Sequence, residues 1–289
     1  MDAPLRRIGR GLNVSSEAER CVEIIRDQIG DAAIDVGLVL GVGLFAIADH
    51  ATQAISIPYS ELPGFHAPEG MAYELLLGII GTARVAVFRG RANYNETGDI
   101  NAMRVPLETL ARLGAKAVVL TGVAGAVRNE IQPGTLLTIT DHVNLTGFNP
   151  LIGEADGGGF IDMAGTYDRH LRERYNLASS HLGRKTHEGE VMWIPGPSFE
   201  TPAEARVAQK LGADLVSMTI VPEAILARRF GLRVLGVAVA TNLAAGLRHE
   251  PMTRDIQLRA AGAAASSLSR VLGKFFEIWQ VESRGIRLG

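Results

Sequence analysis

The hexapeptide Gly196-Pro197-Ser198-Phe199-Glu200-Thr201 places an aromatic ring beside a carboxylate, directly after an apolar segment. A flat heterocycle such as a purine needs an apolar wall for its face and a polar group for its edge, and Phe199 and Glu200 offer one of each. Glu200 also fits the acidic first turn of a helix that starts near Ala203. The spacing alone leaves the ligand pocket and the helix terminus equally open.

Polar or polarisable side chains follow two further apolar segments. Thr241-Asn242 comes directly after Val234–Ala240. An asparagine amide carries both donors and acceptors, so at a strand end it either caps backbone groups or contacts a ligand. Met218 and Thr219 follow Leu215–Val216, where a sugar can rest on the thioether and bond to the hydroxyl. A methionine taken in isolation is more often part of the core.

Two other segments have features of an anion site. Gly41-Val42-Gly43-Leu44 follows the buried-strand pattern Val36–Leu40, so its backbone N–H groups can cradle an anion, although such a turn is more often structural. Arg91 follows the apolar run Val85–Phe88, and its planar guanidinium can bind a phosphate or a carboxylate. An arginine at a strand end is more often part of a surface ion pair, so neither segment is decisive by itself.

These candidate residues are carried by helix and strand patterns that alternate along the chain. The predicted helices cover residues 16–29, 103–113, 203–211, 222–229 and 256–281. The predicted strands cover residues 36–40, 85–88, 117–120 with a turn at 121–125, 136–141, 191–194, 215–216 and 234–240. Short apolar strands between helices indicate an α/β fold with a sheet covered on both faces, and pockets in such sheets form at strand ends. The long irregular segment 144–165, with Gly157-Gly158-Gly159 and Phe160, has the length of a functional loop.

Composition excludes several classes of function. The chain has 289 residues, 47% of them hydrophobic, and 29 Lys and Arg stand against 31 Asp and Glu. This balance does not favour a nucleic-acid or lipid surface, which needs clustered cations. The single cysteine, Cys21, allows no intramolecular disulfide, and without a nearby Cys or His cluster it predicts no metal site. Met1–Asn13 lacks the apolar stretch of a signal peptide and no segment has the length of a membrane span, so we expect a cytoplasmic protein.

Joined in order, the segments from about Val36 to Gly262 resemble the trimeric, low-molecular-mass purine nucleoside phosphorylase family. The hexapeptide at 196–201 and the Asp-His-x-Asn-Leu motif at 141–145 are the most specific pieces. The resemblance is carried by IPYSELPGF (57–65), GAKAVVLTGVAGAV (114–127), DHVNLTGFNPLIG (141–153), the loop 160–168, GPSFETPAE (196–204), QKLGADLVSMTIVPE (209–223) and ATNLAAGL (240–247).

The resemblance implies a fold, an assembly and a reaction. The fold is a phosphorylase/hydrolase-like mixed β-sheet sandwiched by helices, in a single domain over residues 1–289. The assembly is a homotrimer with active sites near the subunit interfaces. In the reaction, inorganic phosphate attacks the anomeric carbon of a purine nucleoside and the free base leaves. Phosphate is a co-substrate, and neither a further cofactor nor a metal is implied.

The resemblance also assigns roles residue by residue. Glu200 matches the purine-binding glutamate, and Asn242 matches the asparagine that bonds the N7/O6 edge and favours 6-oxopurines; a donor at N7 stabilises the charge that develops as the base leaves. Phe199, Val216, Met218, Phe160 and Asp255 match positions around the purine and the ribose, Phe160 being the aromatic residue lent by a neighbouring subunit. Arg91, Asn93 and Thr219 match positions around the phosphate, to which the backbone N–H groups of Gly43 and Ala124 can also donate.

The phosphate side departs from the family pattern. Val42 stands where similar enzymes have a serine, and Asn93 stands where they have a histidine. The segment 66–74 offers no counterpart of a second histidine, and the family's Asn-Ala-Ala-Gly turn reads Gly122-Val123-Ala124-Gly125. Asp255 falls where a histidine reaches the sugar 5′-hydroxyl. Losing one hydroxyl and one histidine from an anion site costs about 1–3 kcal/mol each.

Three functions follow from this combination. The first is reversible phosphorolysis of 6-oxopurine ribonucleosides or deoxyribonucleosides, giving the free base and (deoxy)ribose 1-phosphate. The second is a divergent enzyme on the same fold, either a nucleoside hydrolase or a phosphorylase for a 5′-modified nucleoside. The third is a purine or nucleoside binder without catalysis. The retained Arg91 supports the first, while Val42 and Asn93 speak against it.

Overall fold

The computed structural model describes residues 16–154, 160–248 and 250–279. Met1–Asn13 and Gly157–Gly159, to which the sequence analysis refers, lie outside these ranges. The described helices are α1 (Ser16–Ile29), α2 (Tyr94–Thr97), α3 (Arg104–Arg112), α4 (Arg169–His181), α5 (Pro202–Lys210), α6 (Val221–Arg229) and α7 (Arg254–Glu277), with 3-10 turns η1 (Phe45–His50) and η2 (Tyr59–Glu61). The described strands are β1 (Val36–Val39), β2 (Thr52–Pro58), β3 (Glu74–Ile80), β4 (Ala83–Arg89), β5 (Ala117–Ala126), β6 (Leu136–Val143), β7 (His187–Trp193), β8 (Leu215–Ser217) and β9 (Arg233–Leu243).

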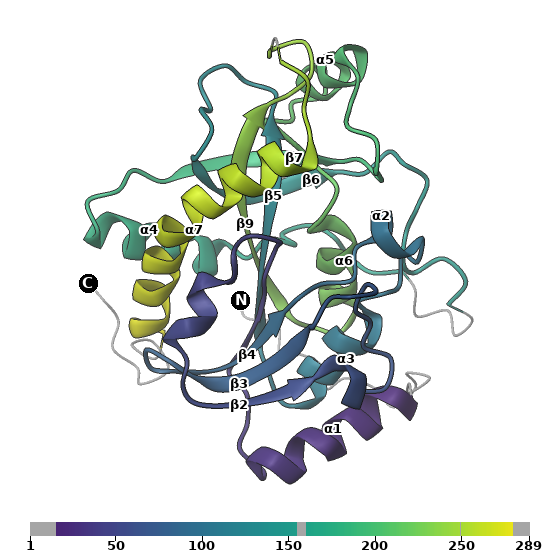
Figure 1. The fold of residues 1–289 in the computed structure, drawn as a ribbon, viewed down its shortest axis with the longest axis vertical. Helices are drawn as coiled ribbons and strands as arrows, with labels where there is room; N and C mark the ends of the chain where they lie inside the picture. The colour runs from purple at the N-terminus through teal and green to yellow at the C-terminus, as the bar shows by residue number, and fades with distance from the viewer. Residues whose placement is uncertain (1–15, 155–159, 249, 280–289) are drawn as a thin grey trace, which may run out of the picture.

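All the described strands belong to one mixed sheet in the order β2-β3-β4-β1-β5-β8-β7-β6-β9. β1 pairs in parallel with β4 and β5, whereas β2-β3 and β3-β4 are antiparallel. β5 pairs with both β8 and β9, so the strands from β5 to β9 close into a ring at one end of the sheet. Figure 1 shows β5 and β9, which belong to this ring, running through the middle of the molecule toward the β2-β3-β4 end. The predicted mixed α/β fold is confirmed.

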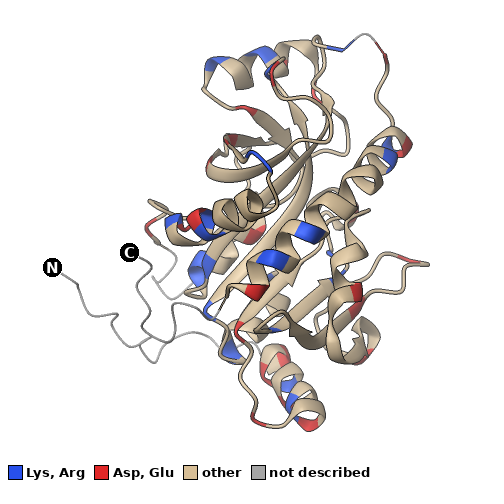
Figure 2. Ribbon diagram, turned by 90° about the vertical axis from the view of Figure 1, so that its left-hand side faces the viewer, with Lys and Arg blue, Asp and Glu red and all other residues tan. Residues whose placement is uncertain are grey.

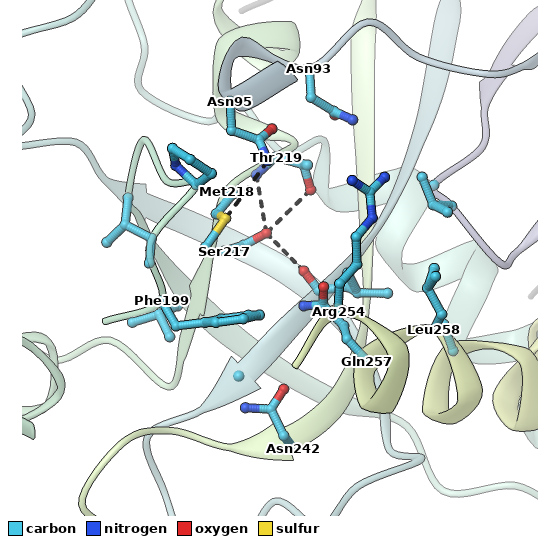
Figure 3. Close-up of a pocket in the computed structure, with 18 of the residues that line it drawn as sticks. Asn93, Asn95, Phe199, Ser217, Met218, Thr219, Asn242, Arg254, Gln257 and Leu258 are labelled. Carbon is cyan, nitrogen blue, oxygen red and sulfur yellow. Dashed lines mark hydrogen bonds between the residues drawn. The ribbon is translucent and has the colours of Figure 1, made fainter. Parts of the chain in front are cut away.

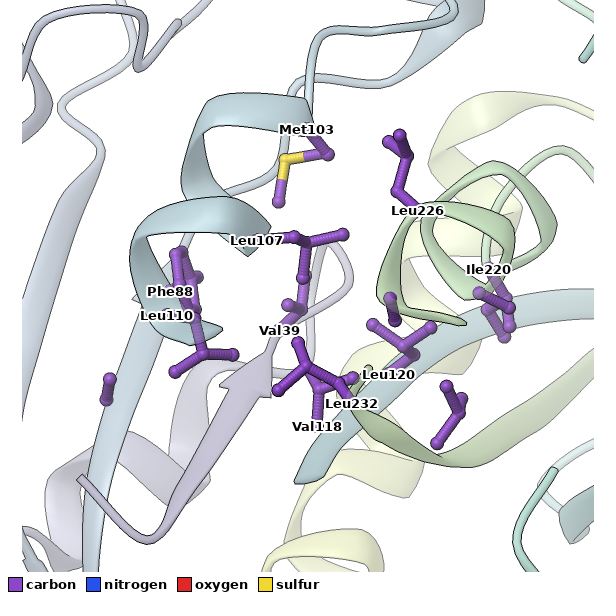
Figure 4. Close-up of a cluster of buried hydrophobic side chains, with 14 of the residues drawn as sticks. Val39, Phe88, Met103, Leu107, Leu110, Val118, Leu120, Ile220, Leu226 and Leu232 are labelled. Atoms are coloured by element: carbon purple, nitrogen blue, oxygen red, sulfur yellow. The ribbon is translucent and has the colours of Figure 1, made fainter. Parts of the chain in front are cut away.

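One face of the sheet carries α3 and α6. Leu107 and Leu110, three residues apart on α3, point toward Val39 of β1 and Val118 of β5, and all four side chains are buried. Figure 4 shows these side chains between the strands and the two helices, with residues of α6 closing the other side. Gly37 of β1 leaves the space that Leu110 occupies, since a Cβ at this glycine would overlap the leucine side chain.

The opposite face carries α7, α4 and η1. Leu268, Leu272 and Phe276 of α7 are buried against the strands in a second hydrophobic cluster. Figure 2 shows α7 crossing this face obliquely, with Lys, Arg, Asp and Glu interspersed along its outer side. The start of α7 therefore arrives at the ends of β5 and β9, where the sequence analysis expects a pocket.

Two sequence predictions about strand ends are wrong. The predicted turn at 121–125 does not exist, because β5 continues to Ala126. β9 likewise continues past Ala240 to Leu243. The glycines that suggest a turn have a different role in the structure. A Cβ at Gly122 would lie 2.7 Å from Thr219 Oγ1, and a Cβ at Gly125 would lie 3.1 Å from Asn242 Nδ2. They make room for side chains rather than for a reversal of the chain.

Other elements were not predicted from the sequence. β2 is largely exposed, so it lacks the continuous apolar run of a buried strand. α4 is polar on most of its surface, although Asp168 provides a helix start signal, its side chain accepting a hydrogen bond of 2.9 Å from Leu171 N. Among the helices in the described ranges, none is apolar over a length sufficient to cross a membrane.

His142, within the Asp-His-x-Asn-Leu motif, is an acid-sensitive point of the fold. Its Nδ1 lies 3.1 Å from the hydroxyl of the fully buried Tyr167. Burial lowers the pKa of His142 below its ordinary value, while neighbouring Asp141 acts in the opposite direction. Below about pH 6.5 the unfolded chain therefore binds a proton that the folded protein does not take up.

We predict that the free energy of unfolding decreases as the pH falls from 7.5 to 5.5, and that His142→Gln makes this decrease smaller. A single histidine contributes at most about 1.4 kcal/mol per pH unit. Urea denaturation at both pH values measures the difference. The control is His66→Gln, at an exposed position, which should keep the wild-type dependence. An unchanged slope in His142→Gln would show that this histidine does not link protonation to folding.

Candidate active site

A cavity of about 160 Å³ lies where the ends of β5, β8 and β9 meet the start of α7. It brings together residues that are far apart in the sequence, as Figure 3 shows for the labelled side chains. The predicted site residues among its walls are Arg91, Asn93, Phe199, Glu200, Val216, Met218, Thr219 and Asn242. The remaining described wall residues are Gly41, Val42, Asn95, Glu96, Val123, Gly125, Ile194, Pro197, Ser217, Arg254, Gln257, Leu258 and Ala261.

The carboxylate of Glu200 is held by the backbone and is not a helix cap. α5 begins with a capping box in which Thr201 Oγ1 accepts from Glu204 N at 3.2 Å, and Glu204 Oε2 accepts from Thr201 N at 2.7 Å. The helix start is therefore satisfied by Glu204. Glu200 is 7% exposed, and its Oε1 accepts a hydrogen bond of 2.7 Å from Ala245 N. Its Oε2 has no hydrogen-bond donor among the residues described.

The amide of Asn242 is fixed in a similar way. It lies in β9, where Oδ1 accepts from Thr241 Oγ1 at 2.9 Å and Nδ2 donates to Leu243 O at 2.9 Å. On the neighbouring strand, Gly125 carries no side chain and leaves Nδ2 facing the cavity. Glu200 and Asn242 are thus anchored to the same short segment, residues 243–245, and both line one cavity. Figure 3 shows Asn242 near the ring of Phe199.

Arg91 is a buried cation and not part of a surface ion pair. Its side chain is 3% exposed and its Nε lies 3.2 Å from Glu223 Oε1, which is itself almost fully buried. Nε also donates to Asn93 Oδ1 at 2.9 Å, and Nη1 donates to Thr121 O at 3.1 Å. Only Nη2 has no acceptor within the described part of the chain. The protein therefore uses two of the five N–H groups of this guanidinium, the Nε–H and one N–H of Nη1.

Asn93 continues this row of contacts outward. Its Nδ2 donates to Glu96 Oε2 at 2.8 Å, and the other oxygen of Glu96 accepts from Arg254 Nη2 at 3.0 Å. The row Arg91–Asn93–Glu96–Arg254 crosses from the end of β4, through α2, to the first residue of α7. We call these four residues the arginine row.

Thr219 and Ser217 present hydroxyl groups to the cavity. Ser217 Oγ donates to Val123 O at 2.9 Å and lies 3.2 Å from Thr219 Oγ1, near the centre of the view in Figure 3. Thr219 Oγ1 fits because Gly122 has no Cβ. Ser217 was not identified from the sequence, although its place beside Met218 at a strand end was a usable signal.

Four predicted residues are not among the described residues that line the cavity. Ala124, whose backbone N–H was the predicted donor, lies in β5 between Val123 and Gly125, which do line the cavity, and is paired with Ala240 of β9. Gly43 faces α7, since a Cβ there would lie 3.1 Å from Ala261 Cβ. Phe160 is 98% exposed.

Asp255 does not line the cavity because of its position around the axis of α7. Arg254, Gln257, Leu258 and Ala261 line the cavity, and the spacing i, i+3, i+4, i+7 is one face of a helix. Asp255 lies about 100° around the helix from Arg254 and is exposed. The same periodicity identifies Arg254 and Gln257, once the sequence places the start of α7 at the pocket.

Over the described ranges, no group of three or more His, Cys, Asp or Glu side chains is arranged to hold a metal ion. Cys21 is buried and its Sγ lies 3.1 Å from Pro63 O, and desolvation raises the pKa of its thiol to about 11. It therefore remains protonated at neutral pH.

The fold and the cavity together define an α/β enzyme site with an aromatic wall, a carboxylate and an amide at one end and a buried arginine at the other. A family model described as the Phosphorylase superfamily matches residues 35–277. Purine nucleoside phosphorylase of Mycobacterium tuberculosis is 41% identical over 258 residues, covering 88% of this chain and 93% of that protein. Purine nucleoside phosphorylase 1 of Geobacillus stearothermophilus is 40% identical over 242 residues, covering 82% and 88%.

Solved structures of purine nucleoside phosphorylases also resemble this chain. Schistosoma mansoni purine nucleoside phosphorylase in complex with adenosine matches with a TM-score of 0.84 at 26% identity, covering 90% of this chain and 96% of that one. A schistosome purine nucleoside phosphorylase in complex with hypoxanthine matches with a TM-score of 0.83 at 25% identity over the same shares. The chain belongs to the phosphorylase superfamily and, within it, to the purine nucleoside phosphorylases. The predicted family is confirmed, and so is the predicted class of enzyme, which transfers the pentose of a purine nucleoside to phosphate and is called a pentosyltransferase.

We predict that Glu223→Gln lowers the free energy of unfolding by about 3 kcal/mol, because it leaves the buried Arg91 guanidinium without its counter-charge. Urea denaturation measures this change. The matched control is Glu173→Gln, which removes the partner of Arg169 from an exposed ion pair and should change stability little. Equal effects of the two substitutions would contradict a stabilising role of the buried pair.

Proposed function

We propose that the protein catalyses the reversible phosphorolysis of 6-oxopurine ribonucleosides and deoxyribonucleosides. A phosphate oxygen bonds to the anomeric carbon as the glycosidic bond breaks, and the products are the free base and (deoxy)ribose 1-phosphate. The observation that carries the proposal is that Glu200 and Asn242 face the same cavity as Arg91 and Thr219. Base recognition and anion binding are thus available within the reach of one nucleoside.

At the base end, the purine lies against Phe199 and bonds along its edge. A carboxylate only accepts hydrogen bonds, so Glu200 fits a base edge that presents N–H groups, as N1–H of hypoxanthine and guanine does. The Asn242 amide faces N7, where negative charge develops as the base leaves. Because its two local hydrogen bonds fix the amide beforehand, it stabilises the transition state without reorganisation. Met218 and Val216 lie beneath the sugar.

At the anion end, Arg91 and Thr219 bind phosphate, and the contribution of Arg91 is reduced by its ion pair with Glu223. Val42 adds an apolar wall and Asn93 adds no charge. We therefore expect weaker phosphate binding than a site with the serine and histidine of the family pattern would give. The same observations favour nucleoside hydrolysis as the second candidate function.

The proposal also covers the oligomeric state, the cellular compartment and the metabolic role of the protein. The chain acts as one domain and forms a homotrimer in the cytoplasm, where it serves purine salvage with no cofactor other than its co-substrate phosphate. Support for the homotrimer comes from apolar side chains exposed on one segment, namely Leu145, Phe148, Ile152 and Phe160. In such an assembly, Phe160 completes the site of a neighbouring subunit.

We predict that inosine and guanosine release their bases only when phosphate is present. The measurement is base release from each nucleoside in phosphate buffer and in phosphate-free buffer. Equal release without phosphate would establish a hydrolase instead. If neither buffer supports turnover while purines still raise the melting temperature, the protein is a binder.

We predict that Asn242→Ala lowers kcat/KM for inosine by about 100- to 1,000-fold, the usual loss when a preorganised transition-state donor is removed. The melting temperature should change much less, because the amide makes only two local hydrogen bonds. Steady-state kinetics and thermal denaturation measure both effects. Asn129→Ala, at an exposed position away from the cavity walls, is the control. Wild-type activity in Asn242→Ala would remove the assigned base pocket.

A further inference from the structure

The anion end of the cavity contains a second cation that the sequence comparison with the family does not assign. Arg254 lines the cavity together with Gly41, Val42 and Thr219. Figure 3 shows its side chain extending from the first turn of α7 toward Asn93, beside Leu258. Asp255, the next residue of α7, which the resemblance places near the sugar 5′-hydroxyl, is not among the described wall residues.

Arg254 is held at this place by specific contacts. Its Nη2 donates to Glu96 Oε1 at 3.0 Å, and Glu96 is 14% exposed while Arg254 is 58% exposed. A cation in the first turn of a helix is opposed by the helix dipole, so the helix itself does not favour this arginine. The carboxylate of Glu96, which also accepts from Asn93, supplies the compensating attraction.

The arginine row connects this cation to the first one. Arg91 and Arg254 stand at its two ends, and Asn93 and Glu96 join them through hydrogen bonds of 2.8 to 3.0 Å. The pKa of the Tyr73 hydroxyl is affected by both arginines. Burial raises this pKa and Glu96 raises it further, whereas Arg91 and Arg254 lower it. The two guanidinium groups therefore act on the same region.

The two arginines differ in the hydrogen-bonding capacity that they retain. Arg91 keeps only Nη2 without an acceptor in the described structure, whereas Arg254 uses Nη2 alone and keeps Nη1 and Nε. Because Nη2 carries a second N–H, one pair of parallel N–H groups, from Nη2 and either Nη1 or Nε, remains for two oxygens of one tetrahedral anion. The Arg254 side chain is exposed, so it can also shift slightly to meet the anion.

We propose that Arg254 binds the phosphate co-substrate together with Arg91 and Thr219, and so replaces the polar groups that Val42 and Asn93 do not provide. This inference rests on the proposed phosphorolysis. Glu96 and Asn93 act as positioning residues, because they hold the two guanidinium groups on either side of the anion. The apolar surface of Val42 closes the site and is not a ligand.

The experiment compares Arg254→Gln, Arg254→Lys and wild type with phosphate and inosine varied separately. We expect Arg254→Gln to raise KM for phosphate about 10- to 100-fold, the usual effect of losing charge-assisted hydrogen bonds. KM for inosine should stay within about twofold of the wild-type value. Arg254→Lys should recover part of the loss, because it restores the charge but not the planar fork.

The matched control is Arg259→Gln, which removes one charge from an exposed position of the same helix and should leave KM for phosphate unchanged. An unchanged phosphate KM in Arg254→Gln would overturn the proposal. So would a raised KM for inosine, but not for 5′-deoxyinosine, at constant phosphate KM, since Arg254 would then bind the 5′-hydroxyl.

Calorimetric titration of inorganic phosphate, without nucleoside, separates this inference from the proposed function. If the wild type binds phosphate and Arg254→Gln does not, the site assignment holds even when no turnover is found. If the wild type turns over inosine with phosphate and both proteins bind phosphate equally, the function holds and the role of Arg254 fails. Absence of phosphate binding to the wild type would overturn the role as well.

Discussion

The buried ion pair between Arg91 and Glu223 determines how the anion end of this site is built. A charge removed from water must be paired, so the guanidinium can occupy only the place where Glu223, Asn93 and Thr121 O meet it. These contacts join the end of β4, the start of α6 and the middle of β5. The same contacts fix the direction in which the remaining nitrogen points. Arg91 therefore has a well-defined position, but its ion pair with Glu223 offsets much of its positive charge.

The base end is constructed differently. Glu200 and Asn242 are held mainly by backbone groups of residues 243–245, with the Thr241 hydroxyl on the amide oxygen, and Gly125 leaves the space that the amide needs. Backbone anchors do not change when neighbouring side chains are replaced. The anion end depends on a row of side chains, in which each partner can be exchanged. The two ends of the cavity therefore differ in how far their geometry depends on neighbouring side chains.

The sequence predicts the α/β class, the family and eight residues of the cavity wall, because apolar strands and the polar residues after them leave a local signal. It does not predict where β5 ends, since glycines that accommodate Thr219 and Asn242 resemble a turn. It also places Asp255 near the sugar, whereas the residues of α7 that line the cavity are Arg254, Gln257, Leu258 and Ala261. The difference arises because matching α7 to a family pattern by position ignores the rotation of about 100° per residue that determines the face of a helix.

The geometry also bears on whether phosphate or water is the nucleophile. Water needs a general base within hydrogen-bond reach, whereas phosphate is already an anion. Among the described residues that line the cavity, Glu96 and Glu200 are the carboxylates and there is no histidine. Both oxygens of Glu96 accept hydrogen bonds from Asn93 and Arg254, and Glu200 is anchored at the base end. The Glu96 carboxylate is thus held between an amide and a guanidinium, and both Arg91 and Arg254 line the cavity. The side chains therefore suit an anionic nucleophile better than a neutral one.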